Sequence, residues 1–207
     1  MTPHFVWRKL HSFSGIFPVG VFLLEHLFTN SFAIQGAEAY ESKIRFLQSI
    51  PYLVLVELAL ILLPLLYHGV YGLIITAGMG NNTARYPQLH NWMYLLQRVS
   101  GVATFIFVAV HVYTLRISNL LFGTEITFDL VSSILGNNLM FVFYTVGLAA
   151  TVFHFANGIW NFLISWGITA GRGSQRTAGW CCAAIGAALF LAGFNSLLAF
   201  VGCGIRF

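Results

Sequence analysis

Four histidines lie inside long apolar segments of this chain at a nearly constant spacing. His26, His68, His111 and His154 are separated by 42, 43 and 43 residues. An ionisable side chain at membrane depth is costly and by default marks a functional site with a partner. Neutral imidazole is also the commonest metal ligand among side chains. The spacing therefore predicts a metal or cofactor site within a membrane.

The elements that carry these histidines follow from composition. Of 207 residues, 58% are hydrophobic and 8% are charged, whereas about 25% of the residues in a soluble domain are charged. A helix needs about 20 apolar residues to cross the hydrocarbon core, and backbone groups in lipid must be satisfied within the segment. We therefore expect an all-α integral membrane protein, one domain over residues 1–207. Its five transmembrane helices are predicted at 13–34, 52–77, 92–118, 138–168 and 178–203.

Basic residues are distributed unevenly between the two ends of these spans. One end carries Arg8, Lys9, Arg85, Arg172 and Arg176 without acidic residues, whereas at the other end acidic residues balance Lys43, Arg45, Arg116 and Arg206. The other end includes the most polar stretch, 34–51, whose apolar residues recur at helical spacing and predict an interfacial helix. The loop 122–138 can carry a similar helix. Because cytoplasmic loops are rich in Lys and Arg, the N-terminus is expected in the cytoplasm. Such a face sets topology or docks an acidic partner, and nucleic acid is not expected to bind.

Depth in the membrane arranges the histidines in two pairs. Each lies past the middle of its span in the direction of the chain. Because successive helices run antiparallel, His26 and His111 should share the outer half of the membrane. His68 and His154 should share the inner half.

Glycines recur at matched positions around the histidines. A Ser-Gly dipeptide precedes the histidines of the first and third spans, with its glycine eleven or ten residues upstream. The histidines of the second and fourth spans are followed four residues later by Gly72 and Gly158. Residues four apart share one helix face, so each glycine leaves room beside an imidazole for a flat macrocycle. Close helix packing is the other use of such small residues.

Two opposed imidazoles in lipid suit haem better than zinc, because zinc needs three or four ligands that converge on one point. Two histidines fill both axial positions of a haem iron, which favours electron transfer over oxygen chemistry. The first four spans would then form a haem-binding bundle. A haem-free transporter remains an alternative; it predicts discontinuous helices or an inverted repeat. Pro18 and Pro64 could break helices, or kink them to shape a haem pocket.

A series of motifs across the chain resembles one protein family. In order they are RKLHSFSGIFPVGVFLLEHL, NSFAIQGAEAYES, LPLLYHGVYG, NWMYLLQRVSG, HVYTLRI, FHFANGIWNFLISWGIT and SQR. They resemble the cytochrome b membrane anchor of succinate:quinone oxidoreductases and fumarate reductases, in its single-chain, five-helix, two-haem form. Their order disfavours the related anchors of hydrogenases and formate dehydrogenases.

The resemblance implies cofactors and partners. It implies two haem b groups, the outer ligated by His26 and His111 and the inner by His68 and His154. A flavoprotein subunit and an iron–sulfur subunit would dock on the cytoplasmic face, and electrons would pass to a membrane quinone. The chain itself would hold no succinate site. It would be a multi-pass protein of the bacterial cytoplasmic membrane.

Residues for the haem propionates should lie near the cytoplasmic rim. Those at suitable levels are His11, Ser12, Tyr94, Arg98 and Ser165. Arg98 could instead extend its head group to the interface, and His11 could be an interfacial structural residue. His4 and His90 are expected to be surface residues without a role.

Quinone chemistry consumes or releases two protons, so a nearby acidic or polar residue is useful. Glu25, beside a predicted outer ligand, and Glu57 are the carboxylates at membrane depth. Either could equally support a ligand imidazole or a neighbouring helix. The family's fumarate reductases have a carboxylate where this chain has Gln48. Some fumarate-reducing relatives have a proton-conducting glutamate where it has Val152. These departures favour succinate oxidation, with menaquinone as the acceptor.

Overall fold

The computed structural model describes residues 3–78, 80 and 83–205. These residues form helices and loops without a β-strand. Among them, five helical segments are long and apolar enough to span a membrane, and they are His4–Gln35, Leu53–Ala77, Leu89–Phe122, Asn138–Ser165 and Arg172–Phe200. The predicted all-α, five-span class is confirmed.

The first span differs from the prediction in its start and in its continuity. It begins near residue 4 rather than 13, because the charged N-terminal segment is helical although its hydropathy is low. It consists of α1 (Pro3–Ile16), α2 (Val19–Ser31) and a 3₁₀ turn, η1 (Phe32–Gln35). The break falls at Pro18, because proline has no backbone N–H and its ring crowds the preceding turn.

The second span stays continuous through its proline. It consists of α4 (Leu53–Glu57), a π-helical turn η2 (Leu58–Leu62) and α5 (Leu63–Ala77). Pro64 is the second residue of α5, and α5 directly follows the π-helical turn. Local π-helical adjustment is one way in which membrane helices satisfy the backbone groups that a proline frees. The expectation that both prolines could break helices therefore holds for Pro18 and not for Pro64.

The later spans match the predicted segments with shifted ends. The third consists of α6 (Leu89–Val112), a π-helical turn η3 (Tyr113–Ile117) and α7 (Ser118–Phe122). The fourth is α9 (Asn138–Ser165) and the fifth is α10 (Arg172–Phe200). Polar loop ends and interfacial aromatic residues blur hydropathy boundaries by several residues.

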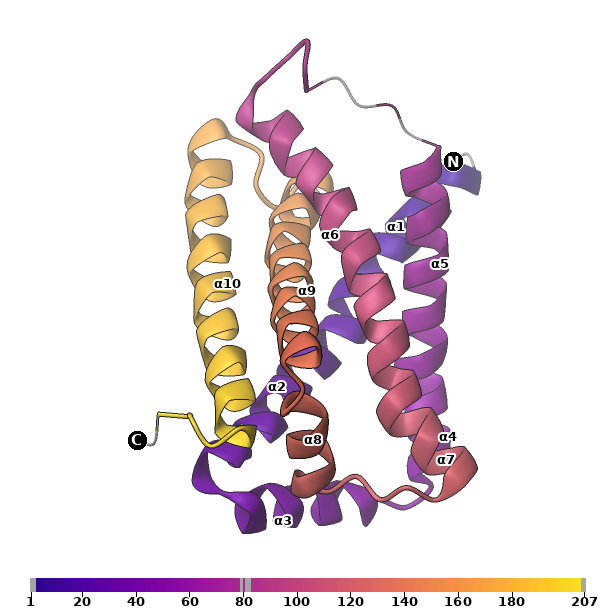
Figure 1. Ribbon diagram of the computed structural model, residues 1–207. Coiled ribbons are helices and arrows are strands. Elements are labelled where there is room, and N and C mark those ends of the chain that lie inside the picture. The colour runs from indigo at the N-terminus through magenta and orange to yellow at the C-terminus, as the bar shows by residue number, and fades with distance from the viewer. Residues whose placement is uncertain (1–2, 79, 81–82, 206–207) are drawn as a thin grey trace.

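Four of the five spans surround the histidines. The first span, α5, α6 and α9 form this bundle, and α10 packs outside it against α9 and α2 (Figure 1). The N-terminus and the loop before α6 lie at one end of the bundle, whereas the C-terminus and α3 lie at the other (Figure 1). The segments that carry Arg8, Lys9, Arg85 and Arg172 therefore lie at the same end of the bundle, the end at which the chain begins.

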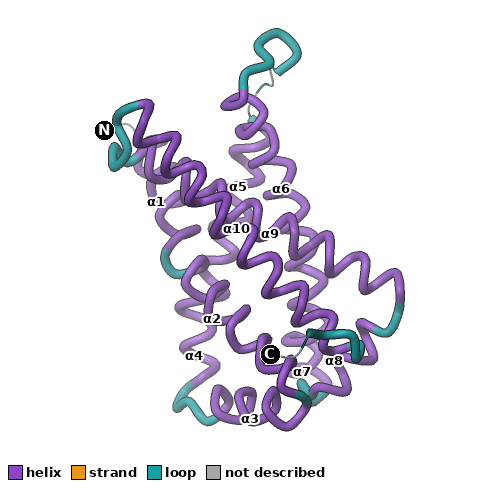
Figure 2. Tube along the Cα trace, turned by 90° about the vertical axis from the view of Figure 1, so that its left-hand side faces the viewer, coloured by secondary structure: helices purple, strands orange, loops and turns teal. Residues whose placement is uncertain are grey.

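Two short helices close the other end, as the sequence predicts. They are α3 (Ala37–Gln48) and α8 (Phe128–Leu135), and α3 runs across the ends of the spans (Figures 1 and 2). Tyr40 of α3 is buried against Phe200 of α10, with ring centroids 5.1 Å apart. Burial, together with the charge of Glu41, raises the pKa of Tyr40 to about 12. This end of the molecule is thus held by a packed core.

Candidate cofactor site

The structure brings the four membrane histidines together as two pairs. The ring centroids of His68 and His154 lie 6.1 Å apart, with their planes at 78°. Those of His26 and His111 lie 5.6 Å apart, with their planes at 80°. A metal–imidazole bond of about 2 Å on each side of one metal ion places two ring centres roughly 6 Å apart. Both separations therefore fit a metal with two axial imidazoles.

A zinc-type cluster is not formed by the residues that the structure describes. No three His, Cys, Asp or Glu side chains among them come close enough to hold a metal ion together. The donor set of each pair is two imidazoles, which is the axial set of a bis-histidine haem.

Hydrogen bonds fix the orientation of both imidazoles in the inner pair. Nδ1 of His68 lies 3.0 Å from the carbonyl oxygen of His11, and Nδ1 of His154 lies 3.0 Å from that of Gln97. A carbonyl oxygen can only accept, so each Nδ1 carries the proton. Each Nε2 therefore keeps its lone pair for a metal, in the way that ligand histidines are usually oriented.

Two glycines contact these imidazoles from the neighbouring helix. A Cβ atom at Gly15 would lie 2.4 Å from Cε1 of His68, and one at Gly101 would lie 2.9 Å from Cε1 of His154. The Ser-Gly dipeptides of the first and third spans thus serve the inner pair, not the histidine that follows each along its own span. The sequence pattern associated each dipeptide with the histidine of the same span and so did not predict these contacts between spans.

The glycines after the inner histidines have different neighbours from those predicted. A Cβ atom at Gly72 would lie 3.1 Å from Nε2 of His11, and one at Gly158 would lie 3.4 Å from Nε2 of Gln97. Side chains from the adjacent helices cover these glycines. Their place beside a flat macrocycle stays a prediction.

The outer pair is less fully hydrogen-bonded. The Nδ2 atom of Asn30 lies 3.3 Å from Nε2 of His26 and donates to the His26 carbonyl at 2.8 Å. In the described part of the chain, Nδ1 of His111 is buried without a hydrogen-bond partner. The rings of Phe107 and Tyr144 contact His111, with centroids at 5.6 and 5.7 Å. The surroundings of His111 are therefore mainly aromatic, in contrast to the hydrogen-bonded inner pair.

The predicted propionate residues have distinct surroundings. His11 stacks on His68, with ring centroids 4.2 Å apart and planes at 6°, so it belongs to the inner pair's surroundings. The guanidinium of Arg98 lies 4.0 Å from the ring centroid of Tyr94 and donates to the carbonyl of Gly80 at 3.2 Å.

The remaining two propionate candidates are serines at the same end of the bundle. Ser12 lies half-buried on α1. The hydroxyl of Ser165 donates to the carbonyl of Phe162, and its own carbonyl accepts from Nζ of Lys9 at 2.5 Å. Lys9 of α1 thus caps the C-terminal end of α9.

Of the residues predicted to handle protons, Glu25 has a hydrogen-bond partner on its own helix, whereas Gln48 is exposed. Glu25 accepts a hydrogen bond from Oγ1 of Thr29, one turn along its own helix, at 2.7 Å. Gln48 is exposed at the end of α3.

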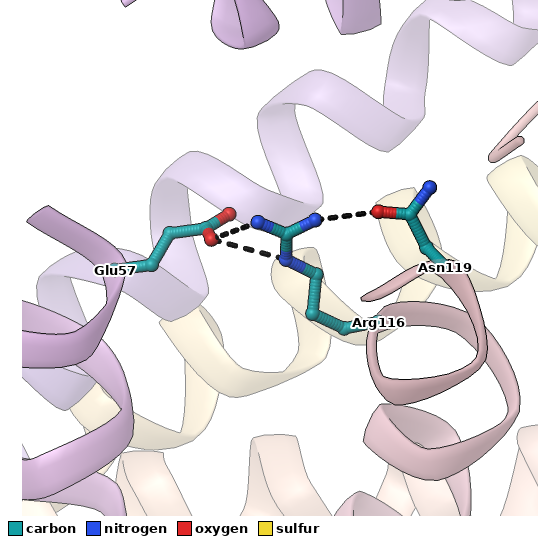
Figure 3. Close-up of polar contacts among 3 residues, drawn as sticks. All are labelled: Glu57, Arg116 and Asn119. Atoms are coloured by element: carbon teal, nitrogen blue, oxygen red, sulfur yellow. Dashed lines mark hydrogen bonds and ion pairs between the residues drawn. The ribbon is translucent and has the colours of Figure 1, made fainter. Parts of the chain in front are cut away.

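Glu57 forms an ion pair with Arg116 of the third span (Figure 3). Nε of Arg116 donates to Oε2 of Glu57 at 3.0 Å, and Nη2 contacts the same oxygen. Nη1 donates to Oδ1 of Asn119 at 2.7 Å. Glu57 directly precedes the π-helical turn η2, and Arg116 lies within η3. The opposite charges of Glu57 and Arg116, at the same ends of neighbouring spans, could have indicated this ion pair, but the sequence-based predictions did not pair them.

A cavity beside the outer pair was also missed. It has a volume of about 420 Å³ and lies between the end of the third span and the α8–α9 corner. Its lining includes Tyr113, Thr114, Ser118 and Asn137. The hydroxyl of Thr114 donates to the carbonyl of His111 at 3.2 Å. The cavity thus offers polar groups one turn beyond a predicted ligand, and could hold a compact, partly polar head group.

The two histidines predicted to be silent lie at the surface. His4 and His90 are exposed, although His90 stacks on Trp160 with ring centroids 5.1 Å apart. Neither is part of a histidine pair.

Comparison with known proteins gives two findings. The family model of the succinate dehydrogenase/fumarate reductase transmembrane subunit matches residues 78–193. The chain is 44% identical over 197 residues to the succinate dehydrogenase cytochrome b558 subunit of Bacillus subtilis (strain 168). That alignment covers 95% of this chain and 97% of the relative.

Proposed function

The chain belongs to the succinate dehydrogenase/fumarate reductase transmembrane-subunit family, and on that premise we propose that it binds two haem b groups and conducts electrons between an iron–sulfur subunit and membrane quinone. The family makes it a membrane-spanning subunit of an oxidoreductase complex. The inner haem would lie between His68 and His154, and the outer haem between His26 and His111. Haem held by two imidazoles would supply one-electron transfer rather than oxygen chemistry.

The geometry of the inner pair is the observation that carries this proposal. The ring centroids of His68 and His154 lie 6.1 Å apart. In each ring Nδ1 carries the proton, so Nε2 is available to a metal. Hydrogen bonds to His11 and Gln97 hold these rings before a ligand binds, so little reorganisation opposes coordination. At the outer pair, the ring spacing of 5.6 Å supports the second haem.

The partners follow from the two ends of the bundle. We propose that flavoprotein and iron–sulfur subunits bind at the cytoplasmic end, where described loops and helix ends carry Arg8, Lys9, Arg85 and Arg172 without acidic residues. The quinone would bind at the outer end, in the cavity lined by Thr114 and Asn137.

The direction proposed is succinate oxidation with menaquinone as the acceptor. Val152, at the position of a proton-conducting glutamate in some fumarate-reducing relatives, is buried and apolar. Glu57 is engaged in an ion pair with Arg116 of the third span. Glu25, Glu57 and Gln48 remain the proton and quinone candidates.

Alanine variants of the histidines test the haem assignment. The wild-type chain should contain two low-spin b-type haems, visible in a reduced-minus-oxidised spectrum. His26→Ala or His111→Ala should remove the outer haem, and His68→Ala or His154→Ala the inner one. His4→Ala is the matched control and should keep both. Retention of both haems after loss of any predicted ligand would overturn the pairing.

Co-purification distinguishes the remaining alternatives. A flavoprotein and an iron–sulfur subunit should be recovered with the tagged chain, and succinate should reduce its haems in membranes. Haems without these partners would point to another kind of cytochrome anchor. A chain with no haem spectrum would point to a haem-free membrane protein such as a transporter.

A further inference from the structure

The positions of the inner histidines and of the residues around them recur in the chain, with the same residue type in all but one case. The members of each pair are separated by 86 residues, and the pairs are His11 and Gln97, Ser14 and Ser100, Gly15 and Gly101, His68 and His154, and Gly72 and Gly158. The first set comes from α1 and α5, and the second from α6 and α9. The first and third spans run in the same direction, as do the second and fourth. Two consecutive spans therefore form one unit, and the bundle contains two such units.

Each serine makes the same contacts in its own unit. The Ser14 hydroxyl donates to the carbonyl of His11 at 2.9 Å, and its Oγ lies 3.3 Å from Nδ1 of His68. The Ser100 hydroxyl donates to the carbonyl of Gln97 at 3.1 Å, and its Oγ lies 3.4 Å from Nδ1 of His154. In both units, that same carbonyl accepts the imidazole Nδ1–H at 3.0 Å.

The serines are buried at the point where the two helices of each unit meet. Ser14 is 6% exposed and Ser100 is 8% exposed. A hydroxyl that donates along its own helix commonly bonds a carbonyl three or four residues back. Here that carbonyl also binds the imidazole of the next span, so the hydroxyl is part of the ligand's surroundings.

The duplication stops short of the outer pair. His26 and His111 are 85 residues apart, one residue out of register with the repeat. The first span breaks at Pro18, between the duplicated residues and His26, whereas α6 runs unbroken to Val112. The serine contacts thus belong to the inner pair alone.

We propose that Ser14 and Ser100 are equivalent positioning residues for the two inner haem ligands, each acting through a backbone carbonyl and the Nδ1–H of a histidine on the following span. The inference rests on the proposed function. Each hydroxyl shares its carbonyl with the imidazole, and so sets how strongly Nδ1–H is bonded. That bond controls the basicity of the ligand and the orientation of its ring. Because the two units are alike, the two serines should act alike.

Serine substitutions test this directly. Ser14→Ala and Ser100→Ala would be compared with Ser196→Ala, which removes a buried serine hydroxyl bonded to the Ala192 carbonyl at 2.9 Å in α10. Redox titration, low-spin ferric EPR spectra and haem content would be measured on the purified chain. The His68→Ala and His26→Ala variants identify which signal belongs to which haem.

We expect both variants to shift the midpoint potential and EPR spectrum of the inner haem in the same direction and by similar amounts. The shift should be up to about tenfold in the reduction equilibrium, or about 59 mV for one electron. The double variant should show about the product of the single effects, and the outer haem should not change. A threonine at either position keeps the hydroxyl and should restore the wild-type potential.

Several results would contradict the positioning role. An inner haem unchanged in either alanine variant would do so, as would shifts of opposite sign in the two variants. An equal response of both haems, or a threonine variant that behaves like alanine, would assign the effect to packing. Failure of the proposed function is a separate result, since it would show in the wild-type spectrum or in the histidine variants.

Discussion

Alanine in place of Gly15 or Gly101 should displace one ligand of the inner pair and leave the outer pair intact. The new Cβ would lie 2.4 Å from Cε1 of His68 in the first case, and 2.9 Å from Cε1 of His154 in the second. Carbon atoms in contact lie at about 3.5–4.0 Å. The ring of His68 must therefore move by about 1 Å, and the ring of His154 by about half as much.

Displacements of this size matter because metal–ligand distances tolerate roughly 0.2 Å. Forcing a methyl group into such a contact costs about 1–3 kcal/mol, which corresponds to about 5- to 150-fold weaker haem binding. Gly15→Ala should be the more severe variant. Gly173→Ala is the matched control, because a Cβ there would meet no atom within 4 Å.

Haem content per chain, measured by the pyridine haemochrome method across a series of haem concentrations, reports the loss. We expect the inner site of Gly15→Ala to fill only at about 5- to 150-fold higher haem concentration, with the outer haem's spectrum and potential unchanged. Full retention of an unaltered inner haem would refute the contact geometry. Loss of the outer haem instead would refute the assignment of the Ser-Gly dipeptides to the inner pair.

Three further predictions concern other residues of the bundle. His11→Gln copies the residue at position 97 and keeps the backbone carbonyl, so both haems should remain; loss of the inner haem would show that Gln97 is not its structural equivalent. Glu57→Gln leaves Arg116 uncompensated and should lower the unfolding free energy by about 1–3 kcal/mol in detergent, since both side chains are about 30% exposed. A second change, Arg116→Gln, should recover most of this loss, and additive losses would contradict the pairing. His90→Ala removes only a surface ring stack, so haem content and potentials should match the wild type in the same spectra.

Much of the fold was predictable because its signals are local. Twenty or so apolar residues must form a helix in lipid, whatever their neighbours are, so the five spans could be predicted. The helix within 34–51 could be predicted from apolar residues at helical spacing, and the one within 122–138 from the length of that loop. The depth of a histidine follows from its position in such a helix, because each residue adds 1.5 Å. Depth and antiparallel order were enough to match His26 with His111 and His68 with His154.

Helix ends and breaks were less predictable. The first span begins within a charged N-terminal segment that hydropathy places before the span, and only the structure shows that this segment is helical. Pro18 and Pro64 have the same intrinsic chemistry, but one ends a helix and the other lies in the first turn of α5 after a π-helical turn. The surroundings of each proline decided between these outcomes.

The sequence by itself determined the membrane class, the number of spans and the level of each histidine. Tertiary structure alone decided which side chains touch them: Gly15 rather than Gly72 contacts an inner imidazole, and Glu57 pairs with Arg116. The physical reason is that lipid is as apolar as the bundle interior. The hydrophobic pattern of a membrane helix therefore says little about its rotation, and contacts across helices depend on rotation.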